Sequence, residues 1–237
     1  MGAQWGDEVG RRVVQARADD HSSPVQSQPA GSGPGVFRAE WSGVQYRGVR
    51  PFAVQDPGVF VPGPPPALDS VEYAAAFAEV AVLGDASVPA PDLLATYQFW
   101  SLPAGSDQPP GEWLRIALTV GGDRRLSLAQ GARMTALVSM ASADSTVATV
   151  RTKYTYRHWR PTTAIREADT DGNPLTQANP TWTARAGSVG GTPEWVSGHS
   201  SYSGAGVTVL AEFFCSDNIR FGHARPRRRE LLAAIAG

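Results

Sequence analysis

The sequence feature that most restricts the fold is a long stretch crowded with proline and glycine. Nine of the 19 prolines lie between Pro24 and Pro66. Proline fixes φ and removes a backbone donor, so no long helix can cross this stretch. Five aromatic residues recur within it: Phe37, Trp41, Tyr46, Phe52 and Phe60. A disordered linker usually lacks such rings, and we therefore expect an extended connector that lies against a core.

Helical periodicity appears on both sides of this connector. Apolar residues recur at helical spacing in five stretches: 5–19, 71–82, 91–100, 110–120 and a long run after Ser127. Asp69 or Ser70 is a suitable N-cap for the second stretch, and Gly84 is suitable to end it. Alternating strand patterns and Asn-Gly hairpin turns are missing from the sequence. These patterns predict an all-α protein, a helical bundle with long Pro/Gly-rich loops.

Composition excludes several classes of protein. The 21 Lys and Arg against 22 Asp and Glu leave a net charge of −1, which gives no general attraction to nucleic acid or to an anionic membrane. A single cysteine, Cys215, with four histidines excludes a Cys-rich zinc module. No run approaches about 20 apolar residues, so no membrane span is expected.

The N-terminal ten residues lack the basic segment and apolar run of a signal peptide. A cytoplasmic location is the default expectation, with export left open for a longer parent protein. The oligomeric state is left open as well, with a homo-oligomer as one alternative.

Two cations stand out near the end of the long helical run. Lys153 is the only lysine of the chain, and Arg160 follows it by seven positions, just before Pro161. Seven steps of about 100° return to nearly the same helix face, so both cations are expected to project together from one helix. Such a pair can clamp a tetrahedral oxyanion. The alternative is a solvated basic helix face.

A second candidate element is the run Ser197-Gly198-His199. Apolar residues follow it at helical spacing, so Ser197 is expected to be the N-cap of a helix. A helix N-terminus binds anions through its free amides, and Gly198 allows the backbone to approach a ligand closely. His199 can exchange a proton near neutral pH. The alternative is an ordinary serine-capped helix with an incidental histidine.

Together these two elements resemble the first two signature motifs of one superfamily. Lys-x6-Arg-Pro followed by Ser-Gly-His is similar to the pattern of the vanadium-dependent haloperoxidases and the type 2 phosphatidic acid phosphatases. The linker segments 160–166, 169–174 and 179–183 are most similar to the bacterial haloperoxidase-like branch. The resemblance implies a partial haloperoxidase-like helical domain over residues 1–221, truncated at both ends. Residues 222–237 look like an atypical basic C-terminal tail.

The resemblance also implies roles for the residues of the two motifs. Lys153 and Arg160 would bind the oxygens of vanadate, or of phosphate in the phosphatases. Ser197 and the Gly198 amide would donate hydrogen bonds to the same oxyanion, and His199 would be the catalytic acid and base. The implied cofactor is vanadate and the implied substrates are hydrogen peroxide and halide. No residue is assigned as a ligand of the metal.

The sequence departs from the family pattern in two places. Val196 stands where proline usually precedes Ser-Gly-His. The third motif, Ser-Arg, five residues, then the His that ligates vanadium, is not found, and His223 is a poor substitute because no Ser-Arg precedes it. Three alternatives follow: an impaired haloperoxidase, a phosphomonoester hydrolase on the same scaffold, and a non-catalytic oxyanion-binding fragment.

Asp144 and His158 complete the set of residues with expected positions. Asp144 shares a helical face with apolar residues and needs a partner, for which the nearby cations Lys153, Arg157 and Arg160 are the candidates. His158 is expected to be structural, on the same helix as Lys153 and pointing away from it.

Overall fold

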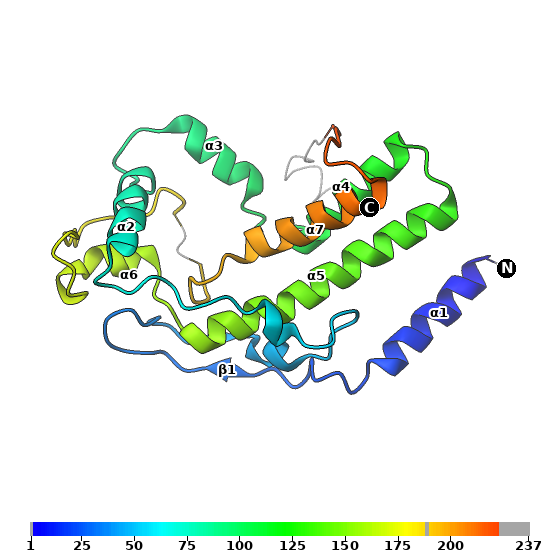
Figure 1. Ribbon diagram of the computed structural model, residues 1–237, viewed down its shortest axis with the longest axis horizontal. Coiled ribbons are helices and arrows are strands. Elements are labelled where there is room, and N and C mark those ends of the chain that lie inside the picture. Colours follow the sequence, from blue (N-terminus) through cyan, green and yellow to red (C-terminus); the bar gives the residue numbers. More distant parts are fainter. Residues whose placement is uncertain (1, 188–189, 223–237) are drawn as a thin grey trace.

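The computed structural model describes residues 2–187 and 190–222 and is helical, as the sequence predicted (Figure 1). The helices and strands in chain order are α1 (Gly2–Ala16), β1 (Ser27–Gln28), β2 (Trp41–Ser42), η1 (Val44–Gly48), η2 (Pro57–Phe60), α2 (Val71–Leu83), α3 (Pro91–Trp100), α4 (Gln108–Asp123), α5 (Leu128–Tyr156), α6 (Pro161–Arg166), η3 (Ala168–Thr170) and α7 (Gly198–Phe214). The strands form one antiparallel pair, with Ser27 opposite Ser42 and Gln28 opposite Trp41. The basic tail expected over residues 222–237 lies outside the described residues from 223 onward.

Serine caps begin three of the helices, as their sequences indicated. Ser70 caps α2 through the Tyr73 amide, and Ser127 forms a capping box with Gln130 at the start of α5. Gly84 ends α2. Ser197 caps α7, so the predicted helix start after Val196 is confirmed.

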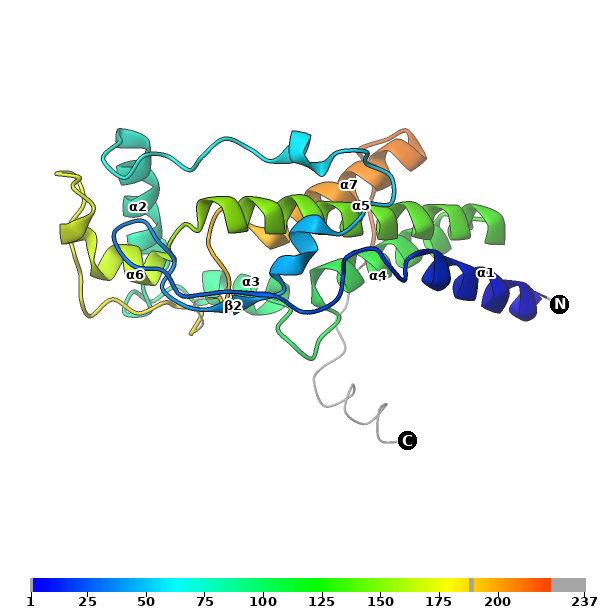
Figure 2. The ribbon, with the colours of Figure 1, turned by 90° about the horizontal axis from the view of Figure 1, so that it is seen from below.

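Helices α4, α5 and α7 form the centre of the bundle (Figure 1). Their facing sides share one core of fully buried residues: Ile116, Ala117, Val120, Met134, Val138 and Leu210. Gly206 allows α7 to approach α4 closely, because a Cβ at this position would lie 2.3 Å from the Trp113 ring. The side of α5 that faces away from α4 and α7 is covered by the proline-rich connector (Figures 1 and 2).

The connector lies against α5, as expected from its aromatic residues. Phe37 and Trp41 are buried in a small core with Val44 and Val150 of α5. The Trp41 indole also donates to the Gln28 side chain at 2.8 Å. Tyr46, Phe52 and Phe60 remain exposed, so only part of the aromatic set is used for packing.

Asp144 fastens the connector to the middle of α5. Its carboxylate accepts hydrogen bonds from the backbone amides of Phe52, Ala53 and Val54 at 2.6, 2.8 and 3.0 Å. The prediction that a nearby cation of the same segment would pair with Asp144 is therefore wrong. Lys153 lies nine residues further along α5, which is about 13 Å along the helix axis and out of reach.

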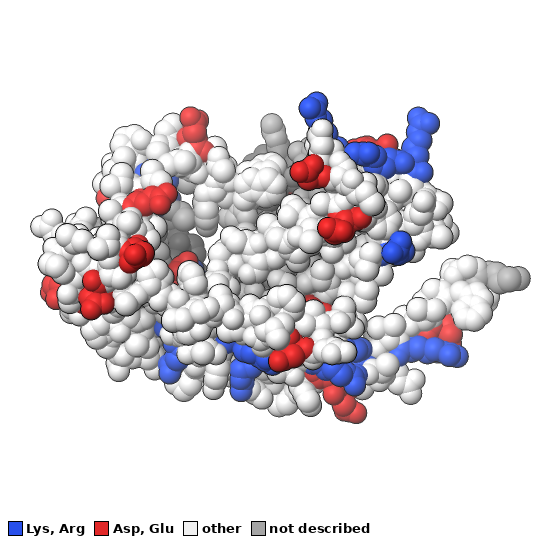
Figure 3. Space-filling model, in the orientation of Figure 1, with Lys and Arg blue, Asp and Glu red and all other residues white. Residues whose placement is uncertain are grey.

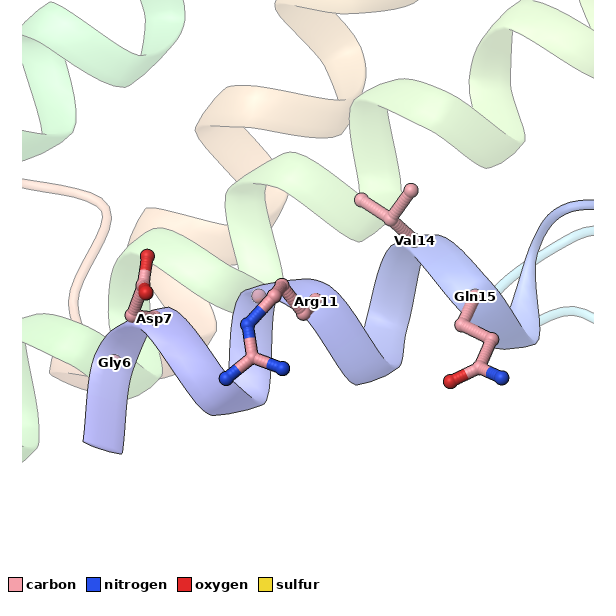
Figure 4. A pocket seen from close by; sticks show the side chains of 6 residues that line it. Gly6, Asp7, Arg11, Val14 and Gln15 are labelled. Carbon is pink, nitrogen blue, oxygen red and sulfur yellow. The ribbon is translucent and has the colours of Figure 1, made fainter. Parts of the chain in front are cut away.

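Helix α1 projects beyond the bundle (Figures 1 and 2) and buries none of its residues. Its helical structure confirms the prediction, but its apolar side chains, among them Trp5 and Val9, are exposed. A shallow hollow runs along it, lined by Gly6, Asp7, Gly10, Arg11, Val14 and Gln15 (Figure 4). Among the described residues no helix is long and apolar enough to cross a bilayer.

Candidate functional site

The two predicted cations come from two different helices. Helix α5 ends at Tyr156, because Arg157 adopts the left-handed conformation with φ of 49°. Arg160 is the N-cap residue of α6, which begins at Pro161. The prediction that Lys153 and Arg160 share one helix face is therefore wrong, and so is the placement of His158 on that helix. His158 instead forms an isolated β-bridge with Val36 of the connector.

The two cations nevertheless meet at one short segment, residues 192–195, which we call the strap. The Lys153 ammonium donates to the carbonyl oxygens of Pro193 and Glu194, the latter at 3.3 Å. The Arg160 guanidinium donates through Nε to the Thr192 carbonyl at 2.5 Å and through Nη1 to Glu194 Oε2 at 2.7 Å. The two side chains therefore come together because the chain changes direction at Arg157, and not because they lie on one continuous helix.

Lys153 is held in an environment that opposes its charge. The residue is only 6% exposed. Burial, together with the nearby positive charge of Arg160, lowers the pKa of Lys153 to about 8, and the Glu194 carboxylate offsets part of this effect. Burial also lowers the pKa of His158, again partly offset by Glu194. A buried cation with few negative neighbours favours the binding of an anion.

The strap leads directly into the N-terminus of α7. Ser197 Oγ accepts a hydrogen bond from the Ser200 amide at 3.3 Å, so this hydroxyl already serves the helix as a cap. Gly198 is the first residue of α7, and a Cβ there would meet nothing within 4 Å. The space beside the first turn is therefore open, which fits the predicted approach of a ligand to its backbone.

The packing of α5 against α7 determines which turn of α5 lies beside this N-terminus. The two helices run antiparallel (Figure 1), and Thr146 Oγ1 and Tyr202 Oη lie 2.9 Å apart. From this contact, Lys153 is seven residues on along α5, about 10 Å, and Ser197 is five residues back along α7, about 7 Å. The turn of α5 that carries Lys153 therefore lies beside the start of α7.

His199 lies in the first turn of α7 and is exposed. Its Nε2 is 3.1 Å from the carbonyl oxygen of Ser101, the C-cap residue of α3. A carbonyl oxygen only accepts, so Nε2 carries the hydrogen in this contact and Nδ1 is left as the basic nitrogen. The imidazole is thus oriented by α3 and keeps one nitrogen for proton transfer.

Thr192 and Glu194 are the site residues that the sequence analysis did not predict. Both contact Arg160, Thr192 also through its hydroxyl at 3.2 Å from Nη2. The one available signal was the dipeptide Pro193-Glu194, which lies just before the Ser-Gly-His run in the sequence. It has no periodicity that would have indicated a contact with a guanidinium more than 30 residues earlier.

The donors of the site suit an anion rather than a bare metal ion. Among the described residues no group of three or more His, Cys, Asp or Glu side chains is arranged to hold a metal. The ammonium, the guanidinium and the helix amides are all hydrogen-bond donors, which match the oxygens of vanadate or phosphate.

His223 lies outside the described residues. In Figure 3 several Lys and Arg side chains lie along the lower edge of the displayed face, with Asp or Glu side chains among them.

Comparison with known proteins agrees with this reading of the fold. Residues 133–233 match the family model of the VCPO second helical-bundle domain. A bacterial vanadium-dependent iodoperoxidase superposes with a TM-score of 0.70 at 24% identity, over 93% of this chain and 54% of that one. A bacterial vanadium-dependent chloroperoxidase in its apo form superposes with a TM-score of 0.51 at 17% identity, over 86% of this chain and 48% of that one. No curated protein matches the sequence.

The matched segment covers both candidate motifs, since it begins in α5 and continues past α7. The chain has a vanadium haloperoxidase-like fold, and the predicted resemblance is confirmed at this level. It spans about half the length of the solved relatives.

Proposed function

We propose that this chain, with its vanadium haloperoxidase-like fold, binds a tetrahedral oxyanion at Lys153 and Arg160 and that this oxyanion is vanadate. The observation that carries the proposal is the convergence of both cations on the strap that leads into α7. A buried ammonium and a guanidinium on separate helices provide donors from two directions, as a four-oxygen ion requires.

The remaining groups complete the donor set. The Gly198 amide at the open end of α7 donates to an oxygen of the anion. The Ser197 hydroxyl accepts from the Ser200 amide and keeps its own O–H to donate to a further oxygen. His199, held by the Ser101 carbonyl, takes up or releases a proton at Nδ1. When bound, vanadate supplies Lewis-acid activation of hydrogen peroxide for the oxidation of halide.

Halide oxidation and oxyanion binding are proposed separately, because they depend on different groups. The 237 residues contain no Ser-Arg dipeptide, with which the third motif of the haloperoxidases begins. The substrates proposed are hydrogen peroxide and a halide, iodide or bromide. The phosphatase alternative uses the same donors with a phosphate ester in place of vanadate.

Replacement of Lys153 by methionine is expected to weaken vanadate binding at least about tenfold, because one buried charge-assisted contact is removed. Isothermal titration of the purified chain with orthovanadate measures the change. Iodide and bromide oxidation are followed in parallel with a halogen-accepting dye, vanadate and hydrogen peroxide. Cleavage of a chromogenic phosphate ester without vanadate tests the phosphatase alternative.

The matched control is Arg151→Met, which removes a cation from the same helix. Arg151 lies beside Asp56 and the Arg47 carbonyl on the connector side and takes no part in the proposed site. Its variant should bind vanadate as the wild type does. Equal binding by wild type and Lys153→Met, or equal weakening in both variants, would reject the proposed site. Halide oxidation that is lost in His199→Ala with vanadate binding retained supports the acid–base role of His199.

A further inference from the structure

The Glu194 carboxylate already occupies a position that an oxyanion would take on Arg160. Glu194 Oε2 accepts from Arg160 Nη1 at 2.7 Å. The other two guanidinium nitrogens donate to Thr192, through its carbonyl and its hydroxyl. A guanidinium binds carboxylate and phosphate through the same planar set of donors. The strap thus presents Arg160 with protein oxygens in place of those of a ligand.

The second cation is engaged by the same segment. The Lys153 ammonium donates to the Pro193 and Glu194 carbonyls, and Pro193 is fully buried. An ammonium has three donor hydrogens, so two carbonyl contacts leave capacity for one oxygen of an anion. Lys153 can therefore donate to a ligand with little rearrangement, whereas the Nη1 hydrogen of Arg160 that Glu194 accepts is released only if Glu194 moves.

Hydrogen bonds hold the strap to the rest of the protein, whereas the Glu194 side chain is partly exposed to water. The Glu194 amide donates to the His158 carbonyl at 2.9 Å, and the Trp195 indole donates to the Gly63 carbonyl at 3.1 Å. The Glu194 side chain is 37% exposed, against 20% for Arg160. A rotation of the glutamate side chain into water would expose the Arg160 donors without unfolding the strap.

We propose that Glu194 is an internal competitor that sets the affinity of this site for tetrahedral oxyanions. In the free protein its carboxylate pairs with Arg160, and it swings into water when vanadate or phosphate binds. This inference rests on the proposed oxyanion site at Lys153 and Arg160. The opposite role, in which Glu194 holds Arg160 in position for the ligand, predicts the reverse effect of the same substitutions.

Glu194→Gln is expected to bind both orthovanadate and inorganic phosphate about three- to tenfold more tightly than the wild type. The substitution removes a negative charge that must be displaced and that repels the bound anion, and the partial exposure of the pair limits the gain. Glu194→Ala should show a gain of similar size, because competition depends on the charge. Titration calorimetry at constant ionic strength measures both anions separately, with sulfate as a third tetrahedral probe.

Glu167→Gln provides the matched control, since Glu167 pairs with Arg38 at 2.6 Å and is 44% exposed. It changes the net charge equally and should leave both affinities unchanged. Affinity that falls in Glu194→Gln, and falls further in Glu194→Ala, would overturn competition in favour of positioning. A gain equalled by Glu167→Gln would also overturn it, as an effect of net charge alone. Absence of binding in the wild type and every variant would instead reject the proposed oxyanion site itself.

Discussion

Asp144→Asn should lower the free energy of unfolding by about 3 kcal/mol, because buried amide donors lose a charged acceptor. The Asp144 carboxylate accepts from three consecutive backbone amides of the connector, and the residue is only 5% exposed. Asparagine keeps one oxygen but turns its NH2 group toward an amide that also donates. At least one of the Phe52, Ala53 and Val54 amides is then left without an acceptor.

Urea unfolding at neutral pH, followed by circular dichroism, measures this loss. Asp85→Asn is the matched control, because Asp85 accepts from the Ser87 amide in a surface turn. Water replaces that contact at no large cost, so the midpoint of the Asp85 variant should stay close to that of the wild type. A wild-type midpoint in Asp144→Asn would contradict the structural role assigned to this carboxylate.

Loss of the hydrogen bonds between Asp144 and the connector should also loosen the attachment of α1. The Arg17 guanidinium lies 3.9 Å from the centre of the Phe52 ring, and Arg17 also donates to the Pro51 carbonyl. Both contacts depend on the position of residues 51 and 52, which Asp144 holds against α5. Amide exchange in α1 should therefore be faster in Asp144→Asn than in the wild type.

Helix positions were predictable from the sequence because their signals are local. Ser70, Ser127 and Ser197 each cap the helix that follows them, through the amide three positions further along. The proline-rich connector was predictable for the same reason, because proline acts on its own backbone and on the residue before it. The all-α bundle with long loops follows from these local rules.

The geometry of the site was not predictable because it depends on contacts between distant segments. Arg157 ends α5 in a left-handed conformation that an arginine rarely adopts, and its amide bonds back to the Lys153 carbonyl. Its guanidinium also reaches the Pro29 carbonyl, 128 positions away in sequence. No local pattern indicates either contact. The expectation that Lys153 and Arg160 lie close together holds, because both contact the strap, but the single helix expected to join them was wrong.

The stability of the wild type should rise by about 2 kcal/mol between pH 7.5 and pH 9.5 through Lys153 alone. The pKa of Lys153 is about 8 in the folded protein, against 10.5 as its ordinary value in the unfolded chain. Between these values the unfolded chain binds more protons than the folded one, so stability increases with pH. Well below pH 8, burial of the charged lysine lowers the free energy of unfolding by its full amount. This amount is about 3 kcal/mol, because each unit of the pKa difference corresponds to about 1.36 kcal/mol.

Urea titrations of the wild type and Lys153→Met at both pH values isolate this contribution, because methionine fills a similar volume and does not titrate. Any stability advantage of the methionine variant should shrink by about 2 kcal/mol from pH 7.5 to pH 9.5. Arg151→Met is the control on the same helix, and its difference from the wild type should not change, since arginine stays protonated throughout. A Lys153→Met difference that is equally independent of pH would show that the ammonium is well solvated. The site would then lack the buried charge that favours an oxyanion.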